Sequence, residues 1–81
     1  MIKPIQVYPN PSNGLFKIET SANLNDAKIT VFDFKGNIIY TKKPEIPFSN
    51  DLDISHLASG MYTIHVETST LNQSLRLVKV E

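Results

Sequence analysis

Apolar and polar residues alternate along most of this chain. In residues 15–20, Phe16 and Ile18 lie on the opposite face from the charged residues beside them. Residues 61–68 follow the same rule, with their apolar side chains on one face: Tyr62, Ile64 and Val66. Because a period of two residues is that of a strand with one buried face, the pattern predicts β-strands.

Segments of this kind recur at fairly regular spacing, separated by clusters of turn-forming residues. The predicted strands cover residues 5–7, 15–20, 27–33, 38–42, 51–54, 61–68 and 74–80. Short strands with turn signals between them are typical of a sandwich of two sheets rather than of a βαβ fold. We therefore predict one all-β domain over residues 1–81, with residues 1–4 as a linker or an expression start. Its predicted architecture is an immunoglobulin-like β-sandwich of about seven antiparallel strands in two sheets.

The last predicted strand is irregular. A polar turn is expected at residues 69–73. The apolar parity then changes along the strand, with Leu75 and Leu77 first, followed by Val78 and Val80. Such a change predicts either a β-bulge or a strand that is apolar on both faces.

Residues 55–60 are predicted to form a corner before the next strand. Tyr62 has the position of the tyrosine whose hydroxyl bonds back to the backbone at the corner of immunoglobulin-like sandwiches. Leu57 is expected to pack under this corner, and Gly60 to let the chain reverse. A helical spacing of apolar residues runs over 54–61, but Gly60 limits it to about one turn.

Two further turns carry strong signals. Pro9 and Pro11 remove backbone donors and fix their φ angles, so residues 9–14 are expected to be a turn. Residues 33–37 predict a tight hairpin in which Gly36 takes the positive φ angle. Phe34 lies in this hairpin and is a candidate for an exposed aromatic side chain.

Composition narrows the classes of function. The 81 residues include no cysteine, which excludes a disulfide framework and a thiolate metal site. Their acidic and basic side chains balance to a formal charge of zero. No electrostatic field favours nucleic acid or an anionic membrane, and no apolar run is long enough to span a bilayer. Because the N-terminus has no hydrophobic signal region, the domain is either cytosolic or part of a longer precursor with an upstream export signal.

Candidate catalytic and metal-binding residues are few. Asp51 and Asp53 share one strand face, but they lack the converging loop oxygens that a Ca²⁺ site needs. His56 and His65 are too isolated for a metal site, and Ser55 beside His56 points to the opposite face of an extended segment. We therefore expect a protein that is not an enzyme, with no metal and no cofactor.

Several segments, taken in order, resemble the type A C-terminal sorting domain of the type IX secretion system. The matching residues are Tyr8-Pro9-Asn10-Pro11 with Gly14, then Val31-Phe32-Asp33 with Gly36, then Ile54-Ser55-His56-Leu57 with Gly60 and Tyr62, and finally Arg76-Leu77-Val78-Lys79-Val80. The resemblance covers nearly the whole chain.

The resemblance implies a role as a transport signal. A fused N-terminal cargo would pass through the periplasm and dock on the type IX secretion machinery at the outer membrane, which includes a shuttle protein and a sortase-like peptidase. The peptidase would then remove the domain at or before residues 1–4, so that the cargo is secreted or held at the cell surface. The domain is then a substrate rather than a catalyst.

The expected partner-recognition residues lie in the last strand, where the family's signal is strongest: Arg76, Leu77, Val78, Lys79 and Val80. Lys79 and Arg76 either contact an acidic partner or form a solvated outer face. If the strand lies at a sheet edge, its free backbone groups can pair with a partner strand. The alternative function is a carbohydrate-binding or adhesion module, which usually needs exposed aromatic side chains in a line.

Overall fold

The computed structural model describes residues 5–20, 23–44, 46 and 48–80. These residues form seven β-strands: β1 (Gln6–Tyr8), β2 (Leu15–Glu19), β3 (Lys28–Asp33), β4 (Ile38–Lys42), β5 (Asp51–Asp53), β6 (Gly60–Glu67) and β7 (Asn72–Lys79). The described part of the chain contains no helix, and therefore no helix that could cross a membrane. Residues 1–4, predicted as a linker or an expression start, lie outside the described residues.

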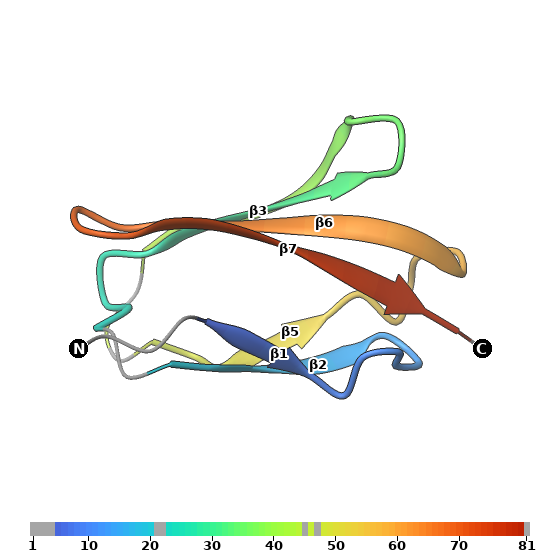
Figure 1. Ribbon diagram of the computed structural model, residues 1–81, viewed down its shortest axis with the longest axis horizontal. Helices are drawn as coiled ribbons and strands as arrows, with labels where there is room; N and C mark the ends of the chain where they lie inside the picture. The colour runs from blue at the N-terminus through green and yellow to red at the C-terminus, as the bar shows by residue number, and fades with distance from the viewer. Residues whose placement is uncertain (1–4, 21–22, 45, 47, 81) are drawn as a thin grey trace.

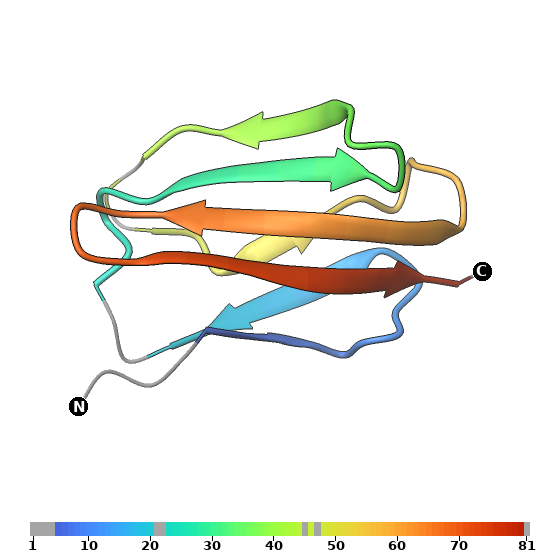
Figure 2. The same ribbon diagram turned by 45° about the horizontal axis from the view of Figure 1, so that its top comes forward.

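The strands form two antiparallel sheets that face each other (Figure 1). One sheet has three strands in the order β1-β2-β5, and the other has four in the order β4-β3-β6-β7. The view in Figure 2 shows the four-stranded sheet lying across the three-stranded one. The predicted all-β sandwich of seven antiparallel strands in two sheets is confirmed.

The core lies between the sheets and comes from the alternating apolar positions. The three-stranded sheet contributes Phe16, Ile18 and Leu52, and the four-stranded sheet contributes Ile29, Val31, Ile64, Val66 and Leu77. Each of these side chains is almost completely removed from water. Burying one large apolar side chain stabilises a protein by about 1.5–3 kcal/mol. The alternation of apolar residues therefore largely determines which face of each strand points to the core.

The last strand is regular, contrary to one of the two sequence-based alternatives. The pairing of β7 with β6 runs without a break from Gly60↔Lys79 to Glu67↔Asn72, and β7 starts inside the predicted polar turn. The bulge of this sheet lies instead between β3 and β4, where Val31 pairs with Tyr40 and Phe32 with Ile38. The apolar residues of β7 therefore occupy both faces, which is the other alternative.

The corner before β6 forms as predicted. The Tyr62 hydroxyl donates a hydrogen bond of 2.5 Å to the Ala58 carbonyl oxygen, while the ring is buried. The Leu57 N–H donates to the Ile54 carbonyl at 3.0 Å, which closes one turn and no helix. Leu57 itself packs against the core. The corner thus holds the start of β6 against the core.

The carboxylate of Asp33 adds to the backbone hydrogen bonds that close the hairpin between β3 and β4. Oδ1 of Asp33 accepts hydrogen bonds of 2.9 Å from the backbone N–H groups of Lys35 and Asn37. The bond from the Asn37 N–H is the main reason why the pKa of Asp33 lies below its ordinary value. Gly36 takes the expected positive φ of 90°, and Phe34 is 77% exposed at the tip.

This hairpin predicts a pH-dependent stability difference. A carboxyl whose pKa is lowered by folding stabilises the folded state above its unfolded pKa, and the contribution disappears as pH falls through the folded pKa. Asp33→Ala is therefore expected to lower stability at neutral pH and to match the wild type at about pH 2. Urea unfolding followed by circular dichroism at both pH values measures the difference. If the stability difference between the two proteins is the same at both pH values, the charge of the Asp33 carboxylate does not contribute to stability.

Candidate docking surface on the last strand

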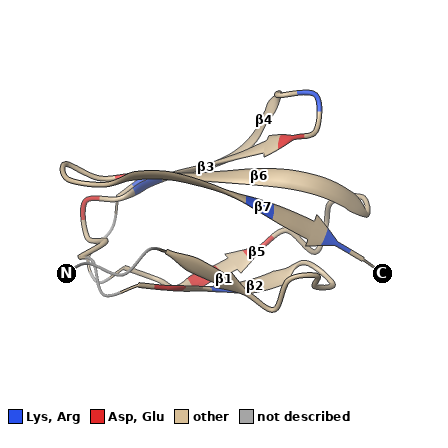
Figure 3. Cartoon of the chain, viewed as in Figure 1, with Lys and Arg blue, Asp and Glu red and all other residues tan. Residues whose placement is uncertain are grey.

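The predicted recognition residues lie on β7, which forms one edge of the four-stranded sheet. Of the seven strands, β6 is the one that pairs with β7 (Figure 1). In Figure 3 its basic residues appear as blue segments in the half of the strand nearest the C-terminus. This half is the place where the sequence predicts contact with a partner.

The strand presents its recognition residues to two different sides. Leu77 is fully buried, and Lys79 is only 7% exposed, so both point toward the opposite sheet. Arg76, Val78 and Val80 alternate with them and point away from the core. Lys79 is therefore mostly buried and does not lie on a solvated outer face, while its contact with a partner stays a prediction.

Lys79 is buried through its aliphatic stem. A Cβ placed at Gly14 would lie 2.9 Å from Cε of Lys79, which shows how closely the stem runs past that backbone. Among the residues of the described ranges, no buried side-chain nitrogen or oxygen lacks a partner. Nζ of Lys79 has no hydrogen bond to this part of the chain, so the ammonium group reaches solvent while the stem packs inside.

The outer edge of β7 is covered by the turn that contains the two prolines. The Asn10 side chain donates through Nδ2 to the Arg76 carbonyl at 2.8 Å, and its Oδ1 accepts from the Val78 N–H at 2.9 Å. Ser12 continues the pairing, because its N–H donates to the Val78 carbonyl at 3.0 Å and its carbonyl accepts from the Val80 N–H at 2.7 Å. Asn10 and Ser12 together act as a short added strand, which we call the edge clamp.

The edge clamp changes the edge-pairing hypothesis. The backbone groups of β7 that a partner strand needs are already bonded from Arg76 to Val80. Pairing with a partner strand along this half would require the clamp to leave. The outer face of the sheet, rather than its edge, is the free surface at the end of β7.

The clamp gives a stability prediction. Asn10→Ala removes both side-chain hydrogen bonds to β7, so we expect the free energy of unfolding to fall by about 1–2 kcal/mol. Asn13→Ala is the matched control, since Oδ1 of Asn13 accepts only long contacts of 3.4 and 3.5 Å. Thermal unfolding of the three proteins measures the effect. Equal melting temperatures for both variants would contradict the clamp.

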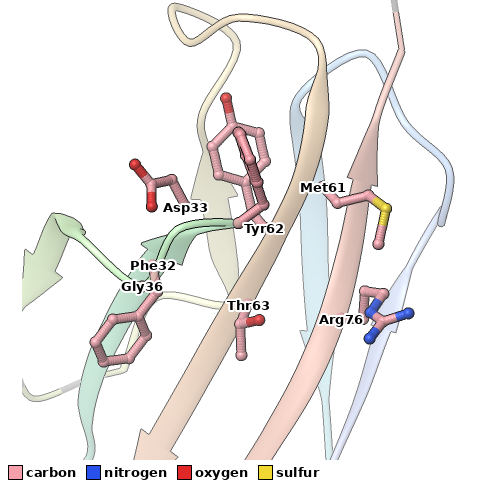
Figure 4. A pocket seen from close by; sticks show the side chains of 8 residues that line it. Phe32, Asp33, Gly36, Met61, Tyr62, Thr63 and Arg76 are labelled. Atoms are coloured by element: carbon pink, nitrogen blue, oxygen red, sulfur yellow. The ribbon is translucent and has the colours of Figure 1, made fainter.

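A hollow of about 320 Å³ opens beside β7 on the outer face (Figure 4). It is lined by the β3–β4 hairpin, by outward residues of β3, β6 and β7, and by the paired residues Asp33 and Tyr62. Figure 4 shows Met61 of β6 beside Arg76 of β7. We define the outer-face patch as the apolar residues around this hollow together with the arginine: Phe32, Phe34, Ile38, Met61, Arg76 and Val78.

Only part of this surface is predicted from the sequence. Arg76 and Val78 are predicted as recognition residues and Phe34 as an exposed aromatic side chain. Phe32 is identified only as part of a family motif, and neither Ile38 nor Met61 is predicted as a surface contact. The missing signal was available, because Met61 precedes Tyr62 and therefore falls on the outward face of β6. Only the pairing of β3, β6 and β7 brings these outward apolar residues together.

The other candidate residues are engaged within the fold. Asp51 forms an ion pair of 2.7 Å with Lys17, and Asp53 accepts from the Ser55 hydroxyl and N–H. No group of three or more potential metal ligands occurs in the described ranges. The large exposed aromatic side chains, Phe34 and Tyr8, lie on different sheets, so they form no line for stacking on sugar rings.

Comparison with known proteins gives one assignment. Residues 6–80 match the family model described as "Secretion system C-terminal sorting domain". A comparison with curated proteins gave no significant match. The match spans β1 to the end of β7, and so includes both the edge clamp and the outer-face patch.

Proposed function

Because the chain belongs to the secretion system C-terminal sorting domain family, we propose that it carries a fused N-terminal cargo across the outer membrane by the type IX secretion system. The family itself is that of type IX C-terminal sorting signals, which act in export to the surface or the medium. The cargo passes through the periplasm on this route. A sortase-like peptidase then removes the domain at the cell surface, ahead of β1.

One observation of the fold supports a role as a signal that is read in the folded state. The two ends of the matched region are joined, since the edge clamp at Asn10 and Ser12 bonds the last strand from Arg76 to Val80. The N-terminal and C-terminal motifs therefore form one surface only when the sandwich is folded. A linear tail alone would not reproduce that surface.

The recognition residues divide into two groups in this proposal. Arg76, Val78 and Val80 point outward and make the contacts with the shuttle protein of the machinery. Leu77 and Lys79 act indirectly, because their buried side chains hold the strand in place. Changes at the outward positions should affect export without unfolding the domain, whereas changes at the inward positions should do both.

The proposal is tested with a reporter protein. A periplasmic signal peptide, a fluorescent or enzymatic reporter and this domain are joined in that order and expressed in a bacterium that has the type IX machinery. We expect the reporter at the cell surface or in the medium, and in the periplasm when the domain is deleted. A wild-type fusion that stays intact in the periplasm would defeat the proposed function.

A further inference from the structure

The outer-face patch exposes several large apolar side chains at one end of the four-stranded sheet. Phe34 is 77% exposed, Ile38 63% and Met61 45%, and all three lie at the same end of the four-stranded sheet. Val78 pairs directly with Met61, and Phe32 pairs with Ile38 across the neighbouring strands. Contiguous exposed apolar side chains of this kind mark interaction surfaces on soluble domains.

The residue types are those of a binding surface. Aromatic residues, methionine and arginine are enriched where proteins contact one another, and the patch combines all three. Phenylalanine and methionine line the hollow of about 320 Å³, which is large enough to accept an apolar side chain. Arg76 lies at the rim of the same hollow.

The charges of this region favour an acidic partner. Arg76 has no ion pair and no side-chain hydrogen bond with any residue of the described ranges. Lys35 adds a second positive charge, with Nζ 5.8 Å from the centre of the Phe34 ring. The Asp33 carboxylate also lines the hollow and stays negatively charged, but its Oδ1 faces the hairpin N–H groups, and the two cations outnumber it. An unpaired guanidinium beside an apolar hollow is suited to a carboxylate that arrives with an apolar side chain.

A second hollow of about 410 Å³ lacks this character. It lies over β2 and β5 on the other sheet, and Leu15 is its exposed apolar residue. Its two nearest opposite charges, Lys17 and Asp51, already pair with each other at 2.7 Å. Its remaining charge is the carboxylate of Asp53, which accepts hydrogen bonds from Ser55 and has the wrong sign for an acidic ligand. This surface therefore presents no unpaired positive charge to a carboxylate and serves as an internal comparison.

The patch also lies away from the point where the cargo joins. The described chain starts at Ile5, whose N–H donates to the Gln73 side chain at 3.0 Å. Gln73 pairs with Val66 near the β6–β7 turn, whereas the patch lies at the β3–β4 hairpin, at the opposite end of the sheet. A cargo entering at Ile5 leaves the patch accessible to a separate protein.

We propose that the outer-face patch docks a peptide segment of the secretion machinery that presents a carboxylate beside a bulky apolar side chain. The apolar side chain enters the hollow between Phe34 and Met61, and the carboxylate pairs with Arg76. This inference rests on the proposed function for the source of the partner. It adds the surface, the residues and the chemistry that recognise the partner.

The test uses the reporter fusion with substitutions in the patch and in the comparison surface. Met61→Asp and Arg76→Glu are each expected to reduce surface delivery of the reporter at least tenfold. Arg76→Lys should retain part of the export, since it keeps the positive charge, and Arg76→Gln should lose more. Leu15→Asp is the control for Met61→Asp and lies on the three-stranded sheet. Lys28→Glu is the control for Arg76→Glu and lies at the far end of the same face of the four-stranded sheet.

Folding is measured separately for each variant. All substituted side chains point to solvent, so the purified domains should melt within a few degrees of the wild type, and variants that do not are excluded from the comparison. Arg76→Gln and Met61→Asp then serve as independent probes of the charge and of the hollow. Wild-type export with every patch variant would overturn the inference while leaving the proposed function intact.

A cross-linking experiment identifies the occupant. A photoreactive phenylalanine analogue replaces Met61 in one fusion and Leu15 in another, and the cells are irradiated during export. We expect cross-links from position 61 to a machinery protein, at a peptide that contains Asp or Glu next to an apolar residue. Cross-links to lipid, to a second copy of the domain or to a basic peptide would each contradict the proposal. Absence of export by the wild-type fusion would instead count against the proposed function.

Discussion

Replacing Gly14 by alanine is expected to lower the free energy of unfolding by at least about 3 kcal/mol. Gly14 has a φ of 116°, and an added Cβ would lie 2.5 Å from Cα and 2.7 Å from the backbone nitrogen of Ser55. Backbone atoms cannot rotate away as the end of a side chain can. Relief would have to come from moving the start of β2 away from the end of β5, where the Gly14 carbonyl accepts from the Ile54 N–H at 2.8 Å.

The matched control is Gly36→Ala. Gly36 also has a positive φ, of 90°, but an added Cβ there meets nothing within 4 Å. Only the backbone strain remains, about 1–2 kcal/mol. Since about 1 kcal/mol shifts the melting temperature of a domain of this size by about 4–8 °C, the two variants should be clearly separated. Equal melting temperatures would show that the close approach at Gly14 is not important.

Removing residues 78–81 is expected to abolish export of the reporter and also to destabilise the domain. The truncation deletes Val78, which bonds both Asn10 and Ser12, and it deletes the buried stem of Lys79. The lost hydrogen bonds and apolar contacts amount to about 2–4 kcal/mol. Surface delivery should fall more than tenfold, because the outward residues Val78 and Val80 are removed with the signal.

A second variant separates the lost signal from the lost stability. Asn10→Ala weakens the same contact with β7 but keeps residues 78–81 in the chain. The backbone bonds of Ser12 to Val78 and Val80 do not involve the Asn10 side chain and still join the two ends of the fold. We therefore expect this variant to export the reporter at a rate near that of the wild type, despite its lower melting temperature. If Asn10→Ala reduces export of the reporter as much as the truncation does, stability alone controls export. The proposal that the secretion machinery recognises the last strand is then wrong.

The last two strands differ in how well the alternation of apolar residues predicts their buried faces. Alternation along β6 predicted its buried face correctly, because each inward position carries an apolar residue: Tyr62, Ile64 and Val66. In β7 the pattern is ambiguous, since Val78 follows Leu77 and a lysine occupies the next inward position. The register with β6 determines which residues of β7 point to the core. Lys79 is one of them, and its long aliphatic stem fills space beside Gly14.

Local chemistry was readable from the chain, and contacts between distant segments were not. The period of two residues, the prolines, the glycine of the hairpin and the tyrosine of the corner determined the all-β class, the turns and the inward faces. These features depend on steric preferences and hydrogen bonds within a few residues of each other. The motif segments also carried the resemblance to the family that the matched residues confirm.

Tertiary structure alone decided how the two ends of the chain meet. Asn10 and Val78 are 68 positions apart, and nothing in the spacing shows that the side chain of one completes the edge of the other. In the same way, the outer-face patch exists because three strands from different parts of the chain pair in one register. Hydrogen bonding between strands depends on which segments become neighbours, and that is fixed only when the two sheets pack around a common core.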